Sequence, residues 1–165
     1  MQPATSSSFI PAAHAPQGAV DRSVDLGRRA VRALDALSPL ADLALRLFVA
    51  AVFFRSGLTK IASWDSTLSL FENVYAVPLL PPAVAAYLGT AVELCLPVLL
   101  VLGLGTRLAA CVLFVFNIIA VVSYPELGAV GLKDHQAWGL MLLVTLLRGP
   151  GALSLDRLIG RRMAR

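Results

Sequence analysis

The sequence has few charged residues and few of the side chains that bind metals or haem. Only 15% of its 165 residues are Asp, Glu, Lys or Arg, against about 25% in an average soluble domain. The two cysteines, Cys95 and Cys111, lie in apolar runs and form no CxxC motif, so we expect no disulfide framework. A haem held by two histidines would need both His14 and His135. Because His14 lies in a polar tail, we expect no haem site.

Other familiar patterns of binding and catalysis are also missing from the sequence. There is no Cys/His array and there are only three methionines, so no metal site is predicted. Neither a glycine-rich nucleotide loop nor a nucleophile motif is present. The net charge of +4 comes without aromatic residues interleaved among the basic ones, so we expect no nucleic-acid partner.

What the chain has in abundance is apolar residues, in runs long enough to cross a lipid bilayer. Hydrophobic residues make up 58% of the sequence, and the mean hydropathy is +0.77. These values are typical of a polytopic membrane protein. We predict an all-α fold, an up-down bundle of four transmembrane helices. The predicted spans are residues 40–61, 83–103, 106–124 and 135–147, with a short helix at the membrane surface after the first span.

The predicted domain organisation is a single membrane domain with short flanking segments. Residues 1–20 are rich in Ser, Ala, Pro and Gln, and we predict a disordered tail there. They lack the basic and apolar regions of a cleavable signal peptide. Residues 21–39 combine charges with apolar residues at helical spacing, which indicates an amphipathic cytoplasmic segment; a charged linker is the alternative. The membrane domain covers residues 40–160, and 161–165 form a basic tail.

The distribution of Lys and Arg predicts the orientation of the spans. Two basic residues, Lys60 and Lys133, fall on one predicted side. Ten fall on the other side: Arg22, Arg28, Arg29, Arg32, Arg107, Arg148, Arg157, Arg161, Arg162 and Arg165. Cytoplasmic loops carry the excess of Lys and Arg, so we expect both termini to be cytoplasmic in a bacterial inner membrane. Arg46 and Arg107 are predicted anchors at the inner face.

One carboxylate lies near the centre of a predicted span. Glu93 is about 15 Å from the start of the second span at 1.5 Å per residue, and Asn117 reaches a similar depth in the third. Arg55 is too deep in the first span to reach water easily, so we expect it to pair with Glu93, with Arg46 as the competing partner. Glu93, Arg55 and Asn117 then form a polar intramembrane pocket, with Lys60 and His135 at its mouth. The alternative is a buried ion pair that only fixes the register of the helices.

The order and spacing of several motifs resemble the DoxX family of membrane proteins. Arg46, Phe53, Gly57, Lys60 and Glu93 follow the family pattern. The stretch LGLGTRL at 102–108 and GPGALSLDR at 149–157 are similar to family motifs. The resemblance covers roughly residues 40–159 and implies a four-helix membrane bundle.

The resemblance also implies two functions of different kinds. The first is a DoxX-type inner-membrane subunit that supports a quinone-linked redox process, in a metal- or oxidative-stress pathway. The second rests on FFRSGLTKI at 53–61 and VPLLPP at 77–82, which resemble a subgroup encoded beside enzymes that modify copper-handling peptides. It is a non-catalytic membrane partner or small-solute carrier for such a peptide system.

Quinone is the cofactor implied by the first function. The expected partners are the lipid bilayer and either another protein or further copies of this chain. Whether the chain is itself an enzyme stays open.

Overall fold

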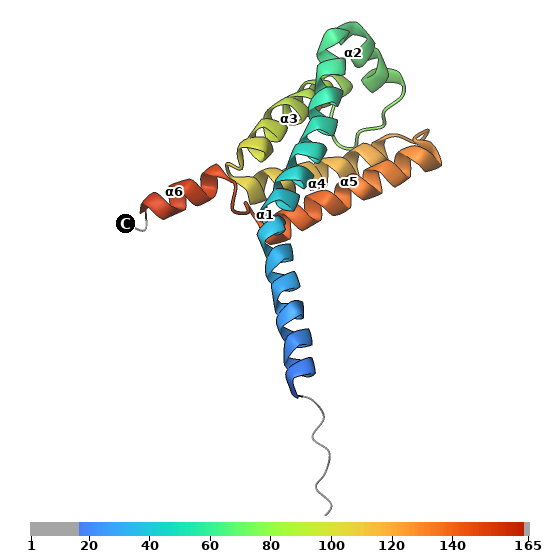
Figure 1. Cartoon of the computed structure of the whole chain (residues 1–165). Helices are drawn as coiled ribbons and strands as arrows, with labels where there is room; N and C mark the ends of the chain where they lie inside the picture. The colour runs from blue at the N-terminus through green and yellow to red at the C-terminus, as the bar shows by residue number, and fades with distance from the viewer. Residues whose placement is uncertain (1–16, 164–165) are drawn as a thin grey trace, which may run out of the picture. The chain divides into compact units, whose positions relative to one another are not determined.

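The computed structural model describes residues 17–163, with side chains from Arg22 onward. They form six helices and, within this range, no strand: α1 (Gln17–Ala62), α2 (Trp64–Asn73), α3 (Pro82–Leu102), α4 (Thr106–Ser123), α5 (Gly128–Arg148) and α6 (Leu155–Met163) (Figure 1). Most of the predicted tail at 1–20 lies outside the described residues. Its last four residues, 17–20, belong to α1.

The predicted class, an all-α polytopic membrane protein, is confirmed. Three segments are long and apolar enough to cross a membrane: Arg22–Ala62 within α1, α3 and α4. The fourth long helix, α5, has 21 residues, but its first half carries Lys133, Asp134, His135 and Gln136. That α5 also crosses the bilayer therefore stays a prediction. Its start was predicted wrongly: the helix begins at Gly128 rather than at His135, because these polar residues continue a helix instead of ending it.

The chain divides into two units, one through Leu37 and one from Ser38 onward. In the first unit every residue from Arg22 to Leu37 is exposed, including the apolar side chains of Val24, Val31 and Leu34. Its side chains make an exposed ion pair of 3.7 Å between Arg28 and Asp25. The predicted boundary at residue 40 does not coincide with the end of a helix, since α1 continues through Pro39.

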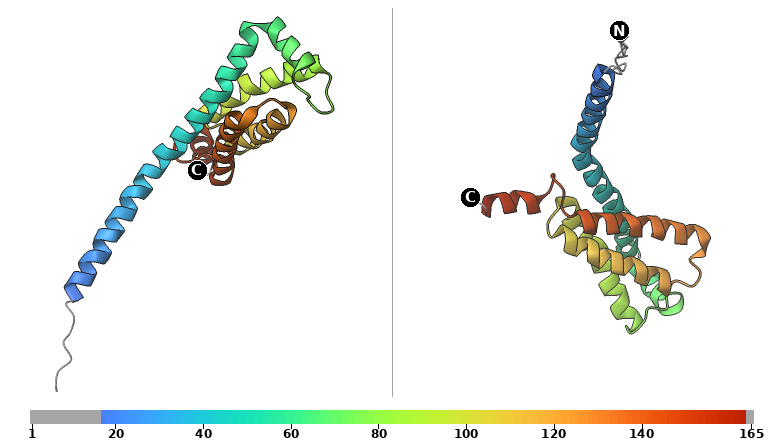
Figure 2. Two further views of the ribbon diagram at one scale, coloured as in Figure 1. Left: turned by 90° about the vertical axis from the view of Figure 1, so that its right-hand side faces the viewer. Right: turned by 90° about the horizontal axis from the view of Figure 1, so that it is seen from below.

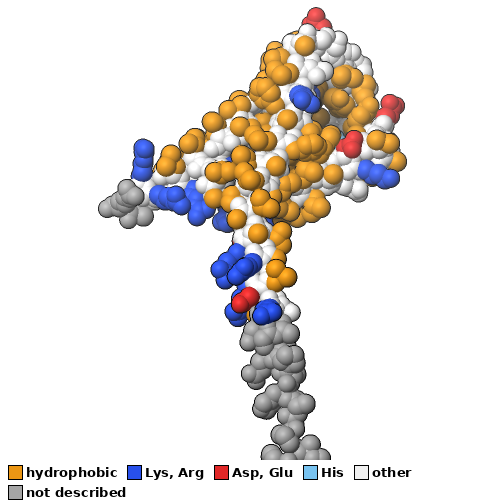
Figure 3. All heavy atoms as spheres, viewed as in Figure 1, with side chains coloured by type: hydrophobic (Ala, Val, Ile, Leu, Met, Phe, Trp, Pro, Cys, Tyr) orange, Lys and Arg blue, Asp and Glu red, His pale blue; other side chains and the backbone are white. Residues whose placement is uncertain are grey.

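Four helices of the second unit contribute to one hydrophobic core. Figures 1 and 2 show α4 and α5 side by side. The fully buried apolar residues come from α1, α3, α4 and α5: Val49, Ala50, Phe53, Leu100, Ala109, Ala110, Leu113 and Leu142. Outside this core, apolar side chains cover the surface of the bundle (Figure 3), among them Leu108, Val122, Leu140 and Leu147. An apolar exterior around a packed interior is what a bilayer environment requires.

The turn between α3 and α4 is short because two of its residues are glycines in a left-handed conformation. Gly103 and Gly105 both have positive φ, 67° and 56°, a conformation that costs glycine little. A Cβ on Gly103 would also lie 2.5 Å from the Arg46 guanidinium and 2.5 Å from Ser154. The turn therefore makes α3 and α4 antiparallel neighbours, as the sequence predicted, and leaves room for the C-terminal segment. We call this end of the bundle the turn end and the opposite one, where α2 lies, the α2 end.

The segment that leads into α6 is held at the turn end by one carboxylate. Asp156 accepts hydrogen bonds from the backbone N–H groups of Gly105 (2.8 Å) and Thr106 (2.9 Å) and from the Thr106 hydroxyl (3.0 Å). It therefore caps the N-terminus of α4 from a distant part of the chain. Burial raises the pKa of Asp156, but these hydrogen bonds and the charge of Arg46 outweigh burial and hold the pKa below its usual range.

Replacing Asp156 with asparagine should destabilise the protein by about 1 kcal/mol at neutral pH, because the cap loses its charge. A group whose folded-state pKa is lowered contributes stability above its unfolded pKa, and loses that contribution as the pH falls through the folded pKa. The difference in melting temperature between the parent and Asp156→Asn should therefore be largest at pH 7 and decrease below about pH 4. Glu126→Gln, an exposed residue of the α4–α5 loop, is the matched control. A constant difference across this range would contradict the assignment.

At the α2 end, α2 and the loop after it close over α3. Phe71 of α2 packs with Ala85 and Ala86 of α3 in a second, smaller core. The Thr67 hydroxyl donates to the carbonyl of Lys60 (2.9 Å), which fixes the turn between α1 and α2. The N–H of Ala76 donates to the carbonyl of Ser123 (2.8 Å), so the loop is attached to the end of α4.

Candidate functional site

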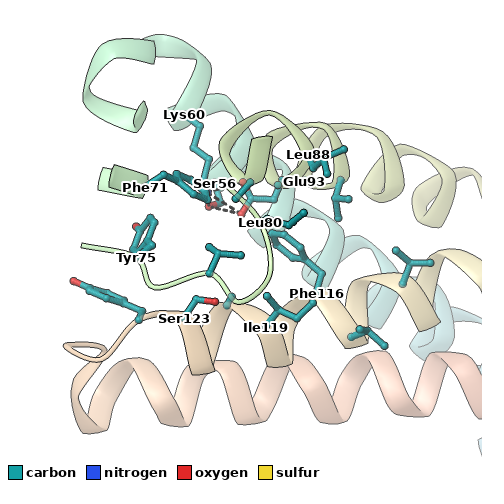
Figure 4. Close-up of a pocket in the computed structure, with 18 of the residues that line it drawn as sticks. Ser56, Lys60, Phe71, Tyr75, Leu80, Leu88, Glu93, Phe116, Ile119 and Ser123 are labelled. Atoms are coloured by element: carbon teal, nitrogen blue, oxygen red, sulfur yellow. Dashed lines mark hydrogen bonds and ion pairs between the residues drawn. The ribbon is translucent and has the colours of Figure 1, made fainter. Parts of the chain in front are cut away.

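A cavity of about 490 Å³ opens at the α2 end of the bundle. It lies between α3 and α4 and is bounded by the last turns of α1, by α2 and by the loop after α2 (Figure 4). Its walls are mostly apolar and aromatic, with polar groups at a few points. The lining residues are Ser56, Lys60, Phe71, Tyr75, Val77, Leu80, Ala85, Leu88, Gly89, Val92, Glu93, Cys111, Val112, Val115, Phe116, Ile119, Ala120, Ser123, Tyr124 and His135.

An ion pair between α1 and α3 forms one polar wall of the cavity. The Lys60 ammonium lies 2.6 Å and 2.8 Å from the two carboxylate oxygens of Glu93, and it also donates to the Ser56 hydroxyl (3.0 Å). The Ser56 hydroxyl in turn donates to Glu93 (3.1 Å). Glu93 is only 5% exposed, so its charge is compensated inside the protein, as an intramembrane carboxylate requires.

The predicted pairing of Arg55 with Glu93 is wrong, and Arg55 does not line the cavity. Its side chain is exposed, and its backbone carbonyl accepts a hydrogen bond from the Thr59 hydroxyl (3.0 Å). Ser56 and Lys60 are four residues apart and share one face of α1, from which Arg55 is rotated by about 100°. Side chains on a helix point back toward its N-terminus. Lys60, predicted at the mouth, therefore reaches down to Glu93.

Asn117 is buried as expected but bonds to α5 rather than to Glu93. Its amide N–H donates to the backbone carbonyl of His135 (2.9 Å), and its amide oxygen lies 2.8 Å from His135 Nδ1. Because Asn117 uses both ends of its amide, it fixes the orientation of the His135 ring. His135 lines the cavity, as its predicted place at the mouth implies, while Asn117 supports it from behind.

The far wall of the cavity carries a buried hydroxyl, that of Ser123. Ser123, at the end of α4, is 4% exposed, and among the described residues its Oγ has no hydrogen-bond partner. Figure 4 shows this oxygen across the cavity from Lys60 and Glu93, with Tyr75 beside it. A buried hydroxyl without a partner costs free energy. The cavity thus has polar groups on two facing walls, of which one is unsatisfied.

Aromatic rings line the space between these polar walls. Tyr75 contacts both Phe71 and Tyr124 edge to face, with centroid distances of 5.0 Å and 5.2 Å. Phe116 enters from α4 and packs against Phe53 of the core at 6.3 Å. A flat ring could therefore be held between aromatic side chains that are themselves anchored to the bundle.

The two predicted anchors lie at the turn end but contact protein. Arg46 is 1% exposed and donates to the carbonyl of Leu153, so it binds the C-terminal segment instead of reaching a lipid headgroup. Arg107 is exposed and lies 3.5 Å from the carbonyl of Leu147 at the end of α5. Neither residue is near the cavity.

Sequence reasoning missed most of the residues that shape the cavity. Ser56 could have been found, since it lies one helical turn before Lys60 on the same face. Ser123, Tyr75 and Phe71 carry no comparable signal, because the loop after α2 brings them together. Within residues 17–163, no group of three or more His, Cys, Asp or Glu side chains could hold a metal ion.

Together, the helices and the cavity define a polytopic membrane protein with a mostly apolar cavity and a buried ion pair at its wall. Residues 41–126 match the DoxX family. The chain is 30% identical to CatD of Bacillus subtilis, named as a candidate oxidoreductase, over 71% of this chain and 85% of that protein. It is 33% identical to the inner membrane protein YphA of Escherichia coli, over 74% of this chain and 92% of that protein. No solved structure gives a significant match. The chain belongs to the DoxX family.

Proposed function

We propose that the cavity binds the headgroup of a membrane quinone, and that this protein is an inner-membrane subunit that supports a quinone-linked redox process. Its turn end and both termini then face the cytoplasm, in keeping with the positive-inside rule. The name of YphA supports the inner membrane, and that of CatD supports a redox process. In this role the chain binds and orients the quinone, and a partner dehydrogenase supplies the electrons.

The observation that carries the proposal is the unpartnered Ser123 hydroxyl opposite the Lys60–Glu93 pair. A para-quinone is a flat ring with a carbonyl oxygen at each of two opposite ends. One oxygen can accept a hydrogen bond from Ser123, and the other faces the wall that carries Lys60 and Ser56. Between them, the ring meets Phe71, Tyr75 and Phe116.

The size and polarity of the cavity agree with such a ligand. Its volume of about 490 Å³ lies within the usual range of small-molecule sites, about 300–1,000 Å³, which are mostly apolar with a few placed polar groups. Reduction of a quinone to a quinol takes up two protons with two electrons. Glu93 and His135 both lie on the cavity wall, and their side chains could pass protons to the ring oxygens.

The test is a titration of the purified protein in lipid nanodiscs with a short-tailed ubiquinone, followed by quenching of tryptophan fluorescence. Trp138 is a suitable reporter, because its ring lies 4.7 Å from that of His135. We expect saturable binding, and a Kd about 3–10-fold weaker in Ser123→Ala, the value of one hydrogen bond.

Ser69→Ala, which changes an exposed hydroxyl on α2, should leave the Kd unchanged. Absence of saturable binding to the parent protein would overturn the proposal. If a soluble metal-binding peptide co-purified with such a protein, the copper-related function would be the better interpretation.

A further inference from the structure

The cavity is elongated along α4, and its two halves differ in polarity. Its lining runs from Ser123 to Cys111, a separation of twelve residues, or about 18 Å of helix. All of its charged and hydroxyl-bearing groups lie toward the α2 end, from Glu93 outward. The rest is a groove of α3 and α4, lined by Val92, Cys111, Val112 and Val115.

This second half of the cavity is open to the surroundings of the bundle. Val112 is 38% exposed and Val115 is 49% exposed, and Cys111 is also exposed. These side chains belong to α4, which is long and apolar enough to span the membrane. The groove therefore faces lipid hydrocarbon, whereas the polar half is covered by α2 and by the loop after it.

We propose that this groove, lined by Val92, Cys111, Val112 and Val115, binds the hydrocarbon tail of the quinone. This inference rests on the proposed function and adds a direction to it. The headgroup enters from the bilayer between α3 and α4 and moves toward the α2 end, while the tail stays between the two helices and leaves the protein beside Cys111.

The arrangement selects a single-chain amphiphile with a compact head. The groove continues the headgroup cavity without a polar barrier. One ligand can therefore place its head in the cavity and its tail in the groove. A two-chain phospholipid would have to place a charged headgroup against the aromatic side chains of Phe71, Tyr75 and Phe116 and leave its second chain outside this groove. The source of the ligand is then the quinone pool of the membrane, and phospholipid occupancy is an outcome that the test distinguishes.

The two native cysteines supply a matched pair of variants for the test. Both are exposed on spanning helices, but Cys111 lines the groove and Cys95 does not. Cys111→Trp should fill the groove from its lipid side without disturbing the core. We would titrate the full-length protein in nanodiscs with two probes, a ring-only benzoquinone and the same ring with a decyl tail.

We expect Cys111→Trp to weaken binding of the decyl quinone by at least tenfold and to leave the Kd of the ring-only quinone within twofold. Cys95→Trp should change neither value. If neither probe binds the parent protein, the proposed function itself fails. If both bind but Cys111→Trp affects both equally or neither, the headgroup site stands and the tail groove is wrong. Competition of the decyl probe by added anionic phospholipid would instead identify a lipid site.

Discussion

Replacing Glu93 with leucine is expected to destabilise the protein by about 3–5 kcal/mol, because it leaves the Lys60 ammonium without its carboxylate. Lys60 and Glu93 have side chains that are only 17% and 6% exposed, and their charged atoms lie 2.6 Å apart. Removing one partner strands the other charge, whereas removing both replaces a buried ion pair by hydrocarbon. The measurement is reversible unfolding in mixed detergent micelles, followed by circular dichroism.

The double variant Glu93→Leu, Lys60→Leu should recover most of the lost stability, and this recovery separates a true pair from two independent contributions. Ser56, which bonds to both partners, can then donate to a carbonyl of its own helix. Arg55→Leu is the control, since its exposed side chain lies on another face of α1. It should change stability by less than about 0.5 kcal/mol. A loss in the double variant equal to the sum of the single losses would show that Lys60 and Glu93 do not interact.

The sequence predicted the buried carboxylate but not its partner, and the reason lies in the length of lysine. Depth along the helices favoured Arg55 as the closest cation, because Lys60 lies near the end of α1. A lysine near the end of a spanning helix is expected to extend its ammonium toward water. In this chain, the Lys60 side chain instead extends back along α1 by about one helical turn. Its ammonium donates there to the Ser56 hydroxyl and to the Glu93 carboxylate. The choice between the two directions depends on the neighbouring helix, which the pattern within α1 does not contain.

More of the fold than of the candidate site could be predicted from the sequence, because the determinants of the fold are local. The apolar runs define α3 and α4, and the two glycines between them define the turn. The cavity depends on contacts across long separations instead. The loop after α2 is attached to Ser123 through Ala76, and Asp156 reaches Thr106 from 50 residues away. Neither contact has a periodic signal in the sequence.

Filling the cavity from α3 should abolish quinone binding while the bundle stays intact, and Gly89 is the position for this change. A Cβ at Gly89 would lie 3.6 Å from both Phe71 and Phe116, an ordinary contact distance. The rest of a leucine side chain would extend into the space between those rings, where the proposed headgroup lies. Leucine also favours a helix over glycine by up to about 1 kcal/mol. We therefore expect Gly89→Leu to fold at least as stably as the parent.

The expected result is a loss of at least 100-fold in affinity for the short-tailed ubiquinone, together with an unchanged or higher melting temperature. Ala91→Leu is the matched control: it adds a side chain of the same size to α3, about 200° further around the helix, where Ala91 is exposed. That variant should bind like the parent.

Because the ring needs the space that Gly89 leaves free, a stable Gly89→Leu protein with undiminished quinone affinity would place the ligand outside this cavity. A variant that lost both stability and binding would instead show that Gly89 serves the packing of Phe71 and Phe116. The Ser123→Ala titration, which changes no packing volume of consequence, would then carry the test of the headgroup site.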